Sequence, residues 1–429
     1  MEYLRGLIGL GVLVGLAYLV SRNKKAIDWR LVGIGILLQI IFGLLITKVG
    51  FVAHGFDWVS GIFVKFLSFS NDGAKFLFGD LTDVNKLGFI FAFQVLPTVI
   101  FFSTITTGLY YLGVLQKVVY GIAWVMARTM RLSGAESLSA AGNIFLGQTE
   151  APLLVRPFVK NMTTSELMCL MTGGMATIAG GVLAGYVAFL GGDDPAERTK
   201  YASYLLSASI MNAPAAIVLS KILIPETNRE AIDSNLRVNQ ESMGVNLIDA
   251  LSTGAAEGLK LALNIGGMLL AFIAVIFAVN WILVDMIGAV TGLNEYVISS
   301  TDGTFRGFSL EYILGQIFRL FAFAMGVDWA ESVQVGSLLG QKIVINEFVA
   351  YLSLSEIKMA GQLSEKAIVI STYALCGFAN FSSIAIQVGG IGGMAPNRQG
   401  DLSKLGMRAL FAATLATMMT ATIAGALFG

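Results

Sequence analysis

Charged residues are scarce in this 429-residue chain: Asp, Glu, Lys and Arg make up 13% of it, and hydrophobic residues make up 55%. Soluble domains carry about 25% charged residues, so a soluble core would not need this much apolar surface. Lys plus Arg and Asp plus Glu are equal at 28 each, and no basic stripe is present. This composition excludes a disordered chain, and it excludes nucleic acid as a partner.

Residues that build metal or catalytic centres are also few. The two cysteines, Cys169 and Cys376, make no disulfide framework and have no metal-ligand spacing. The single histidine, His54, has no His or Cys companion nearby. The sequence has no nucleophile–base pair and no G-x-x-x-x-G-K-S/T phosphate loop. We therefore expect no enzyme, no resident cofactor and no use of ATP as the energy source.

Glycine is abundant at 49 residues and proline is rare at 7, which suits close helix packing in lipid. A bilayer core needs a helix of about 20 apolar residues. Apolar runs that reach or approach this length predict an all-α integral membrane protein with eight transmembrane helices. The runs are 6–21, 31–47, 87–116, 167–192, 201–220, 261–284, 367–397 and 409–429.

Two further charge-free stretches, 137–149 and 332–341, are too short to cross a bilayer. We predict re-entrant hairpins there, because non-helical backbone at membrane depth is tolerated only where protein or a water-filled cavity covers it. The segments 51–80, 118–131 and 310–327 are amphipathic, which predicts interfacial helices.

Basic residues cluster between spans one and two, after span three and before span eight. With eight spans these clusters share one side of the membrane, and the positive-inside rule makes that side the cytoplasm. We therefore expect both termini to face outward. The clusters comprise Arg22, Lys24, Lys25, Arg30, Lys117, Arg128, Arg131, Arg398, Lys404 and Arg408.

An internal repeat relates the two predicted hairpins. Each opens with Ala-Glu-Ser, at 135–137 and 330–332, and each precedes a span with a break, at 173–181 and 376–383. Three spans, an odd number, separate the hairpins, so they enter from opposite faces. Such an inverted-topology repeat is common in secondary transporters, which bind substrate and ion between broken helices. A gated channel can also carry opposed hairpins.

The predicted organisation has four parts. The first three spans and the interfacial helix at about 51–80 occupy 1–115, and the first repeat occupies 116–225. A polar linker and the sixth span occupy 226–290, and the second repeat occupies 291–429.

Two carboxylates, Glu150 and Glu347, lie in otherwise apolar segments. A charged side chain at membrane depth costs about 2.5–3.5 kcal/mol on insertion scales, so each is a functional candidate. The alternative is a buried ion pair with Arg156 or Lys342.

The neighbours of these carboxylates favour a neutral, polar solute. Amides can donate to and accept from a planar base edge, and carboxylates accept from sugar hydroxyls. Because no Arg or Lys cluster is available for phosphate, nucleosides are favoured over nucleotides. The candidate substrate-binding residues are Gln148, Thr149, Glu150, Glu347, Asn380 and Ser383, with Val182 and Phe378 as walls.

A coupling ion would need oxygen ligands, which hard cations prefer. Side-chain oxygens and carbonyl groups freed at a hairpin tip and a helix break can supply them. The alternative for the threonines is a hydrogen bond back to their own helix. The candidate ligands are Asn143, Leu146, Thr149, Thr177 and Ile178.

Three motifs carry a family resemblance. Residues 340–351 match G-x-K-x-x-x-N-E-F-V-A-Y, the signature of the concentrative nucleoside transporter family, and 147–152 (GQTEAP) and 376–380 (CGFAN) match two further motifs. The chain resembles a bacterial member over nearly its whole length. The resemblance implies a sodium- or proton-coupled nucleoside symporter that assembles as a homotrimer. It also implies a scaffold of spans one, two, three and six, and a transport domain that moves as an elevator.

The resemblance assigns roles residue by residue. Gln148, Thr149, Glu150, Val182 and Phe378 match the base site, Glu347, Asn380 and Ser383 the ribose site, and Asn143, Leu146, Thr177 and Ile178 the sodium site. We expect sodium-coupled import of nucleosides such as uridine across the bacterial inner membrane, with both termini periplasmic. The Thr177 hydroxyl favours sodium, and proton coupling through Glu150 or Glu347 is the alternative.

Overall fold

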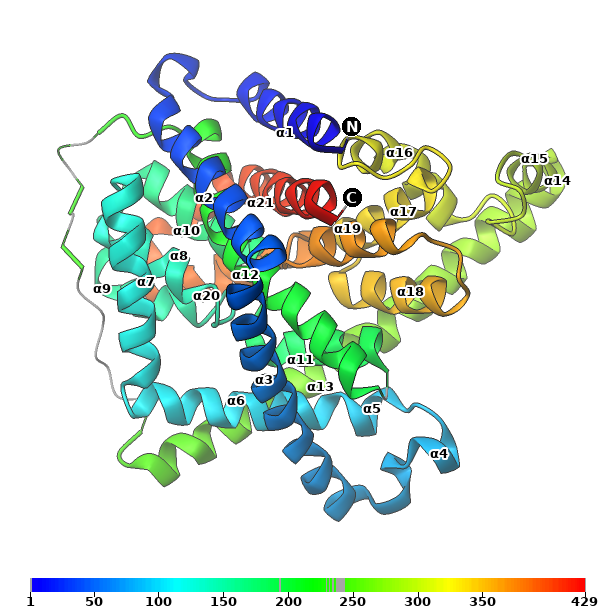
Figure 1. Cartoon of the computed structure of the whole chain (residues 1–429), viewed down its shortest axis with the longest axis horizontal. Helices are drawn as coiled ribbons and strands as arrows, with labels where there is room; N and C mark the ends of the chain where they lie inside the picture. The colour runs from blue at the N-terminus through cyan, green and yellow to red at the C-terminus, as the bar shows by residue number, and fades with distance from the viewer. Residues whose placement is uncertain are drawn as a thin grey trace.

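The computed structural model describes every residue except 1, 193, 229, 231, 234, 237–243 and 429 (Figure 1). All regular elements in this described part of the chain are helices, and it contains no strand. The all-α prediction is therefore confirmed. The centre of the predicted polar linker, 237–243, lies outside the described residues.

Seven segments of the described chain are long and apolar enough to cross a membrane, so the protein is a multi-pass membrane protein. They are α1 (Glu2–Leu19), α2 (Trp29–Lys48), α5 with α6 (Phe91–Gln94 and Leu96–Tyr111), α10 with α11 (Thr164–Ala176 and Gly180–Gly191), α12 (Pro195–Leu223), α13 (Leu247–Asn280) with a π-helical continuation (Trp281–Gly288) into α14 (Ala289–Thr291), and α21 (Gln399–Phe428).

The segment predicted as one further span, 367–397, consists of two shorter helices. These are α19 (Glu365–Leu375) and α20 (Phe381–Met394), and the chain leaves helical geometry between them. Neither half alone has the length of a membrane span, which accounts for the difference between eight predicted spans and seven long helices.

The remaining helices occupy the predicted interfacial and hairpin segments. The three predicted interfacial segments contain α3 (Gly50–Phe78), α7 (Val114–Met130) and α16 (Leu310–Ala324). The first predicted hairpin stretch, 137–149, overlaps α8 (Gly134–Gly142) and is followed by η3 (Ala151–Val155) and α9 (Arg156–Val159), which together are called the first hairpin segment. The second, 332–341, overlaps α17 (Ser332–Val344) and is followed by α18 (Glu347–Met359). The connections contain η1 (Lys24–Ala26), η2 (Gly79–Thr82), α4 (Val84–Leu87), α15 (Leu293–Ser300) and η6 (Pro396–Arg398).

Burial separates a central group of helices from a peripheral group. The 18-residue apolar window of the span formed by α10 and α11 is buried completely, whereas only 6% of the apolar window in the span that begins with α13 is buried. In Figure 1, α10, α12 and α21 lie within the molecule, and α13, which packs on α6, extends to its edge at α14. Leu263, Leu270 and Phe277 of α13 remain exposed. The core therefore lies around the broken helix α10–α11.

Side-chain caps explain where two of the central helices begin. At the start of α8, Ser133 accepts from the Glu136 N–H at 3.1 Å, and the Glu136 carboxylate accepts from the Ser133 N–H at 3.2 Å. Thr163 and Glu166 repeat this capping box at the start of α10. Glu136 also forms a buried ion pair with Lys221 near the end of α12. These contacts fix both helix starts and hold α8 against α12.

Candidate functional site

The two broken helices meet at their breaks. The Phe378 N–H donates to the Thr177 carbonyl at 3.3 Å. At Gly377 a Cβ atom would lie 2.6 Å from the Ala176 carbonyl oxygen, so the close approach requires glycine. Asn212 of α12 joins both breaks. Its Nδ2 donates to the last carbonyl of α10 at 2.9 Å and to the Cys376 carbonyl at 2.7 Å. The half-helices therefore share one buried donor.

Glu347 is held at the first residue of α18 by side chains from two other helices. Tyr186 of α11 donates its hydroxyl to Oε1 at 3.1 Å, and Nδ2 of Asn380 donates to Oε2 at 2.7 Å. Asn380 in turn caps α20, because its Oδ1 accepts from the Ser383 N–H at 2.9 Å. Glu347 is only 2% exposed. The carboxylate is thus oriented by neutral donors.

In the described chain Lys342 makes no direct ion pair with Glu347, which was the alternative that the sequence left open. It lies inside α17, which extends beyond the predicted end of the apolar stretch at 341. Its ammonium donates to the Ala374 carbonyl at 2.8 Å and to the Thr417 hydroxyl at 3.0 Å. Among the described residues no ion pair joins Lys342 and Glu347, so this alternative for the carboxylate is wrong.

Gln148 connects the first hairpin segment to α20. Its Nε2 donates to the Ser383 hydroxyl at 3.0 Å, and its Oε1 accepts from Nε2 of Gln387 at 3.2 Å. All three residues are buried. A continuous set of hydrogen bonds therefore runs from Gln148 through Ser383 and Asn380 to Glu347. The structure brings together these four of the predicted substrate-binding residues.

The other four predicted residues lie outside this set of side-chain bonds. Glu150 is half-buried, and its Oε2 accepts from the Gly147 N–H at 2.7 Å. Thr149 is exposed, Val182 is buried in α11, and Phe378 is half-buried in the second break. Glu150 lines a small cavity of about 40 Å³ together with residues of α6 and with Glu257 of α13.

Two of the predicted ion ligands, Thr177 and Ile178, lie at the first break, and Asn143 lies near it, because a Cβ atom at Gly173 would lie 3.2 Å from its Nδ2. Asn143 is fully buried at the end of α8, and its Oδ1 has no hydrogen-bond partner among the described residues. The Thr177 hydroxyl donates to the Gly173 carbonyl at 2.9 Å, which is the back-bond foreseen as the alternative. This bond uses the hydroxyl hydrogen and leaves the oxygen able to accept. In the described chain no backbone N–H donates to the carbonyl oxygens of Leu146 or Ile178.

This donor set suits a small monovalent cation. Neutral side-chain and carbonyl oxygens are ligands for hard cations. The described residues contain no group of three His, Cys, Asp or Glu that could hold a metal ion. The orphaned buried oxygen of Asn143 supports a ligand at this position, because buried polar atoms are normally hydrogen-bonded.

Sequence reasoning missed three polar residues of this region: Tyr186, Asn212 and Gln387. Asn212 and Gln387 lie within runs that were counted as apolar spans. An amide in such a run was the available signal, because polar groups in lipid need partners. Gln387 also follows Ser383 by one helical turn, which places both on the same side of α20.

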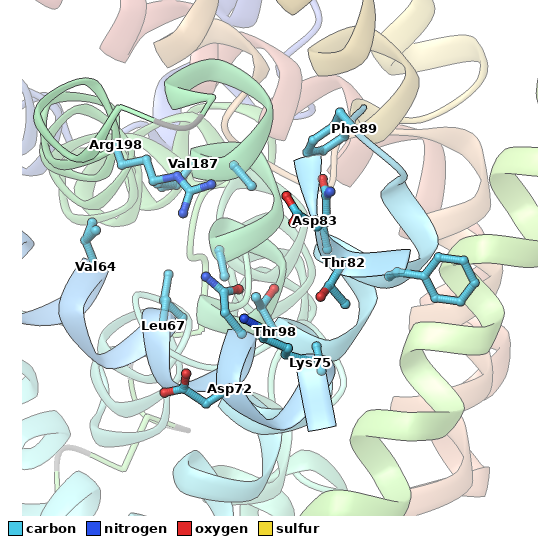
Figure 2. Close-up of a pocket in the computed structure, with 16 residues that line it drawn as sticks. Val64, Leu67, Asp72, Lys75, Thr82, Asp83, Phe89, Thr98, Val187 and Arg198 are labelled. Atoms are coloured by element: carbon cyan, nitrogen blue, oxygen red, sulfur yellow. The ribbon is translucent and has the colours of Figure 1, made fainter. Parts of the chain in front are cut away.

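A larger cavity lies elsewhere. It has a volume of about 520 Å³ and is bounded by α3, by the segment leading into α6, and by α11 and the start of α12. Figure 2 shows Asp72, Lys75 and Arg198 around this cavity together with apolar residues such as Leu67 and Val187. None of the predicted site residues lines it. The cavity lies between α3 and α11, beside the place where α6 packs on α11.

Membrane-length helices that break in pairs around buried polar groups are typical of secondary membrane transporters. Comparisons with known proteins agree with this class. Three family descriptions match: "Na+ dependent nucleoside transporter N-terminus" over residues 8–81, "Nucleoside recognition" over 92–193, and "Na+ dependent nucleoside transporter C-terminus" over 204–425. The chain belongs to the family of sodium-dependent, or concentrative, nucleoside transporters, which confirms the resemblance carried by its motifs.

Individual relatives cover the whole chain. An uncharacterized transporter of Haemophilus influenzae is 42% identical over 434 residues, which span 100% of this chain and 99% of that protein. The human sodium/nucleoside cotransporter 1 is 40% identical over 444 residues, which span 100% of this chain and 64% of the human protein. The solved structure of CNTnw in an inward-facing, substrate-bound state has a TM-score of 0.89 at 39% identity, with 100% of both chains covered.

Proposed function

We propose that this protein is a sodium-coupled symporter that imports nucleosides such as uridine across the bacterial inner membrane. The observation that carries the proposal is the buried set of hydrogen bonds from Gln148 to Glu347. It lies beside neutral oxygen atoms at the first helix break. Family membership and the named sodium/nucleoside relatives support the same solute and ion.

The substrate roles follow from the chemistry of the side chains. Glu347, Asn380 and Ser383 would bind ribose hydroxyls, because a carboxylate only accepts hydrogen bonds while an amide and a hydroxyl can also donate them. Gln148, Thr149 and Glu150 would contact the base directly or through water, and Val182 and Phe378 would wall it. A bound nucleoside would replace the hydrogen bonds Gln148–Ser383 and Asn380–Glu347 with hydrogen bonds from these residues to itself.

The coupling ion in this proposal is sodium, bound by the Asn143 amide oxygen, the Thr177 hydroxyl and the carbonyls of Leu146 and Ile178. Neutral oxygen donors favour sodium over a proton, which would need a titrating group at the same break. The two proposed sites lie at the same helix break, which supports coupling of sodium to nucleoside binding. The bound ion would stabilise the break next to which the nucleoside binds.

The transport cycle would be an elevator in which the central helices move against the peripheral ones. We infer that α8 to α9 and α17 to α18 are re-entrant hairpins of an inverted repeat, entering from opposite faces. The hairpins, α10 to α12 and α19 to α21 would form the moving unit, and α1, α2, α6 and α13 the scaffold. The exposed apolar face of α13 supports a homotrimeric assembly around the scaffold.

Both termini would lie on the periplasmic side. A Cβ atom at Gly6 would lie 2.7 Å from the Ala426 Cβ, so the N-terminal end of α1 lies beside the C-terminal end of α21. In Figure 1 the marked chain ends are correspondingly close. This proximity supports one side for both ends, and the basic clusters assign the opposite side to the cytoplasm.

Uptake of radiolabelled uridine into proteoliposomes tests the proposal. An inward sodium gradient should concentrate uridine above its external level, and replacing sodium with choline should abolish the accumulation. A gated channel would equilibrate uridine without concentrating it. Accumulation driven equally well by a pH gradient without sodium would contradict sodium coupling.

The substitution Glu347→Gln tests the ribose role in the same assay. It turns a pure acceptor into a group that also donates, so we expect the KM for uridine to rise about 10- to 100-fold, the range for hydrogen bonds to a charged group. Glu356→Gln on the exposed face of the same helix is the matched control. Wild-type uptake by Glu347→Gln would remove Glu347 from the site.

A further inference from the structure

Gln387 is a buried amide on α20 that no sequence motif assigned to the site. It is 1% exposed, and its Nε2 donates to the Met171 carbonyl of α10 at 3.1 Å and to Oε1 of Gln148 at 3.2 Å. Its own oxygen has no hydrogen-bond partner within the described chain. The side chain therefore acts as a double donor between a half-helix and the first hairpin segment.

These contacts fix the polarity of the Gln148 amide. A backbone carbonyl can only accept, so the amino group of Gln387, and not its oxygen, must face Met171. The second N–H of this amino group is directed to Gln148, which must therefore present its oxygen to Gln387. The amino group of Gln148 then faces the Ser383 hydroxyl.

The fixed polarity determines what the site offers to a solute. Gln148 uses one N–H for Ser383, and its second N–H remains for a further acceptor. Ser383 accepts from Gln148, so its hydroxyl hydrogen also remains available. This end of the site consequently presents donors, and it would select a carbonyl oxygen or an unprotonated ring nitrogen on the solute.

We propose that Gln387 is a specificity-determining positioning residue, which locks the Gln148 amino group toward an acceptor on the nucleobase. The inference rests on the proposed nucleoside site and adds the source of its polarity. Without Gln387, the Gln148 amide is free to turn and to offer either its donor or its acceptor, so the protein should discriminate less between bases that differ at that edge.

The packing around Gln387 agrees with this role. A Cβ atom at Gly174 of α10 would lie 2.6 Å from Nε2 of Gln387 and 3.2 Å from the Gln148 Cβ. The absence of a side chain at Gly174 therefore leaves the space that both amides occupy. Gln387 can reach Met171 and Gln148 together only because α10 carries glycine there.

The test measures uptake of uridine, cytidine and adenosine in sodium by the full-length protein in proteoliposomes. For wild type we expect different KM values for the three nucleosides. In Gln387→Met the KM of the preferred nucleoside should rise about 3- to 10-fold, as for one neutral hydrogen bond. The ratio of KM values between nucleosides should move toward one. The sodium concentration for half-maximal uptake should change less than about 2-fold, which is less than the loss of one neutral hydrogen bond would cause.

Controls separate positioning from folding. Gln39→Met removes another buried glutamine, whose Nε2 donates to the Gly35 carbonyl at 3.2 Å in α2, and should leave all three KM values unchanged. In a Gln148→Met background, Gln387→Met should have no further effect on KM, because its partner is gone. If the methionine variant does not fold, the ratio of KM values is measured in Gln387→Asn, which keeps the amide group on a shorter side chain.

The outcomes are distinct. Equal KM values for all three nucleosides in wild type, or an unchanged ratio in Gln387→Met, would overturn the inference while leaving the transporter assignment intact. A uniform rise in all KM values with a lowered melting temperature would reduce Gln387 to a structural residue and also overturn it. Absence of sodium-driven uptake by wild type would overturn the proposed function, and this inference with it.

Discussion

At the scale of single residues, the site consists of side chains that already have partners. Glu347 is held by Tyr186 and Asn380, and Gln148 is held by Gln387 and Ser383. A bound solute replaces some of these bonds, so its affinity reflects the difference between two sets of hydrogen bonds. Single exchanges of this kind are worth about 0.5–1.5 kcal/mol, which suits reversible binding and release.

Thr177 tests the ion site at this scale. Thr177→Ala removes one oxygen ligand, so the sodium concentration for half-maximal uridine uptake should rise about 3- to 10-fold. Uptake at saturating sodium should fall much less. Thr177→Ser keeps the hydroxyl and serves as the control. An unchanged sodium response in Thr177→Ala would place the ion elsewhere.

The sequence could predict the polar residues that break an apolar pattern in a recognisable motif. Glu347, Asn380 and Gln148 were predicted in this way, and the structure joins them. Asn212 and Gln387 could not be assigned, because their roles depend on carbonyl groups contributed by helices distant in sequence. A lone amide within an apolar run signals a buried partner and does not identify it.

At the scale of helices, glycine pairs decide how closely the elements approach. Gly173 and Gly174 of α10 face the amides of Asn143 and Gln387. Gly180 and Gly181 at the start of α11 lie against the ring of Phe102 on α6. The first pair leaves space for polar groups of the site. The second pair allows a close contact between a central and a peripheral helix.

Gly174→Ala tests the first pair. A Cβ there meets the flexible end of Gln387, so the amide should shift, and the KM for uridine should rise about 3- to 10-fold as one hydrogen bond is lost. Thermal stability should change little, because the gain of about 1 kcal/mol from alanine over glycine in a helix offsets the lost hydrogen bond, worth about 0.5–1.5 kcal/mol. Gly267→Ala in α13, with open space around it, is the matched control. An unchanged KM in Gly174→Ala would show that this space is not needed.

Helix positions were predicted from apolar runs to within a few residues for most spans, because the bilayer sets their length. The end of α17 was not predicted correctly. The charge of Lys342 marked the end of the apolar stretch at 341, yet the helix continues to Val344. It can do so because the Ala374 carbonyl and the Thr417 hydroxyl, from α19 and α21, satisfy the ammonium.

At the scale of the whole molecule, the contact between α6 and α11 is one of the places where the peripheral and central helices meet. The α6–α11 contact includes Phe102 and Gly181, and the 520 Å³ cavity lies beside it, between α3 and α11. Movement of one group against the other would pass through this contact. A covalent bond across it should therefore stop transport without disturbing the site.

The paired substitution Phe102→Cys with Gly181→Cys tests this movement. The Cβ–Cβ distance would be 3.7 Å, within the range for a disulfide. In a background lacking the buried Cys169 and Cys376, oxidation should abolish sodium-driven uridine uptake, and dithiothreitol should restore it. Gly142→Cys with Ala151→Cys, at 3.5 Å inside the first hairpin segment, is the control. Full uptake by the oxidised α6–α11 pair would contradict relative movement there.

Asn212 has a consequence for stoichiometry. One amide group binds the adjoining ends of two half-helices, so a single side chain joins the proposed sodium site to the proposed ribose site. If the Asn212 hydrogen bonds are lost, sodium or the nucleoside could cross alone, and the sodium gradient would dissipate without coupled transport. The coupling stoichiometry would then depend on a side chain that need contact neither the ion nor the nucleoside.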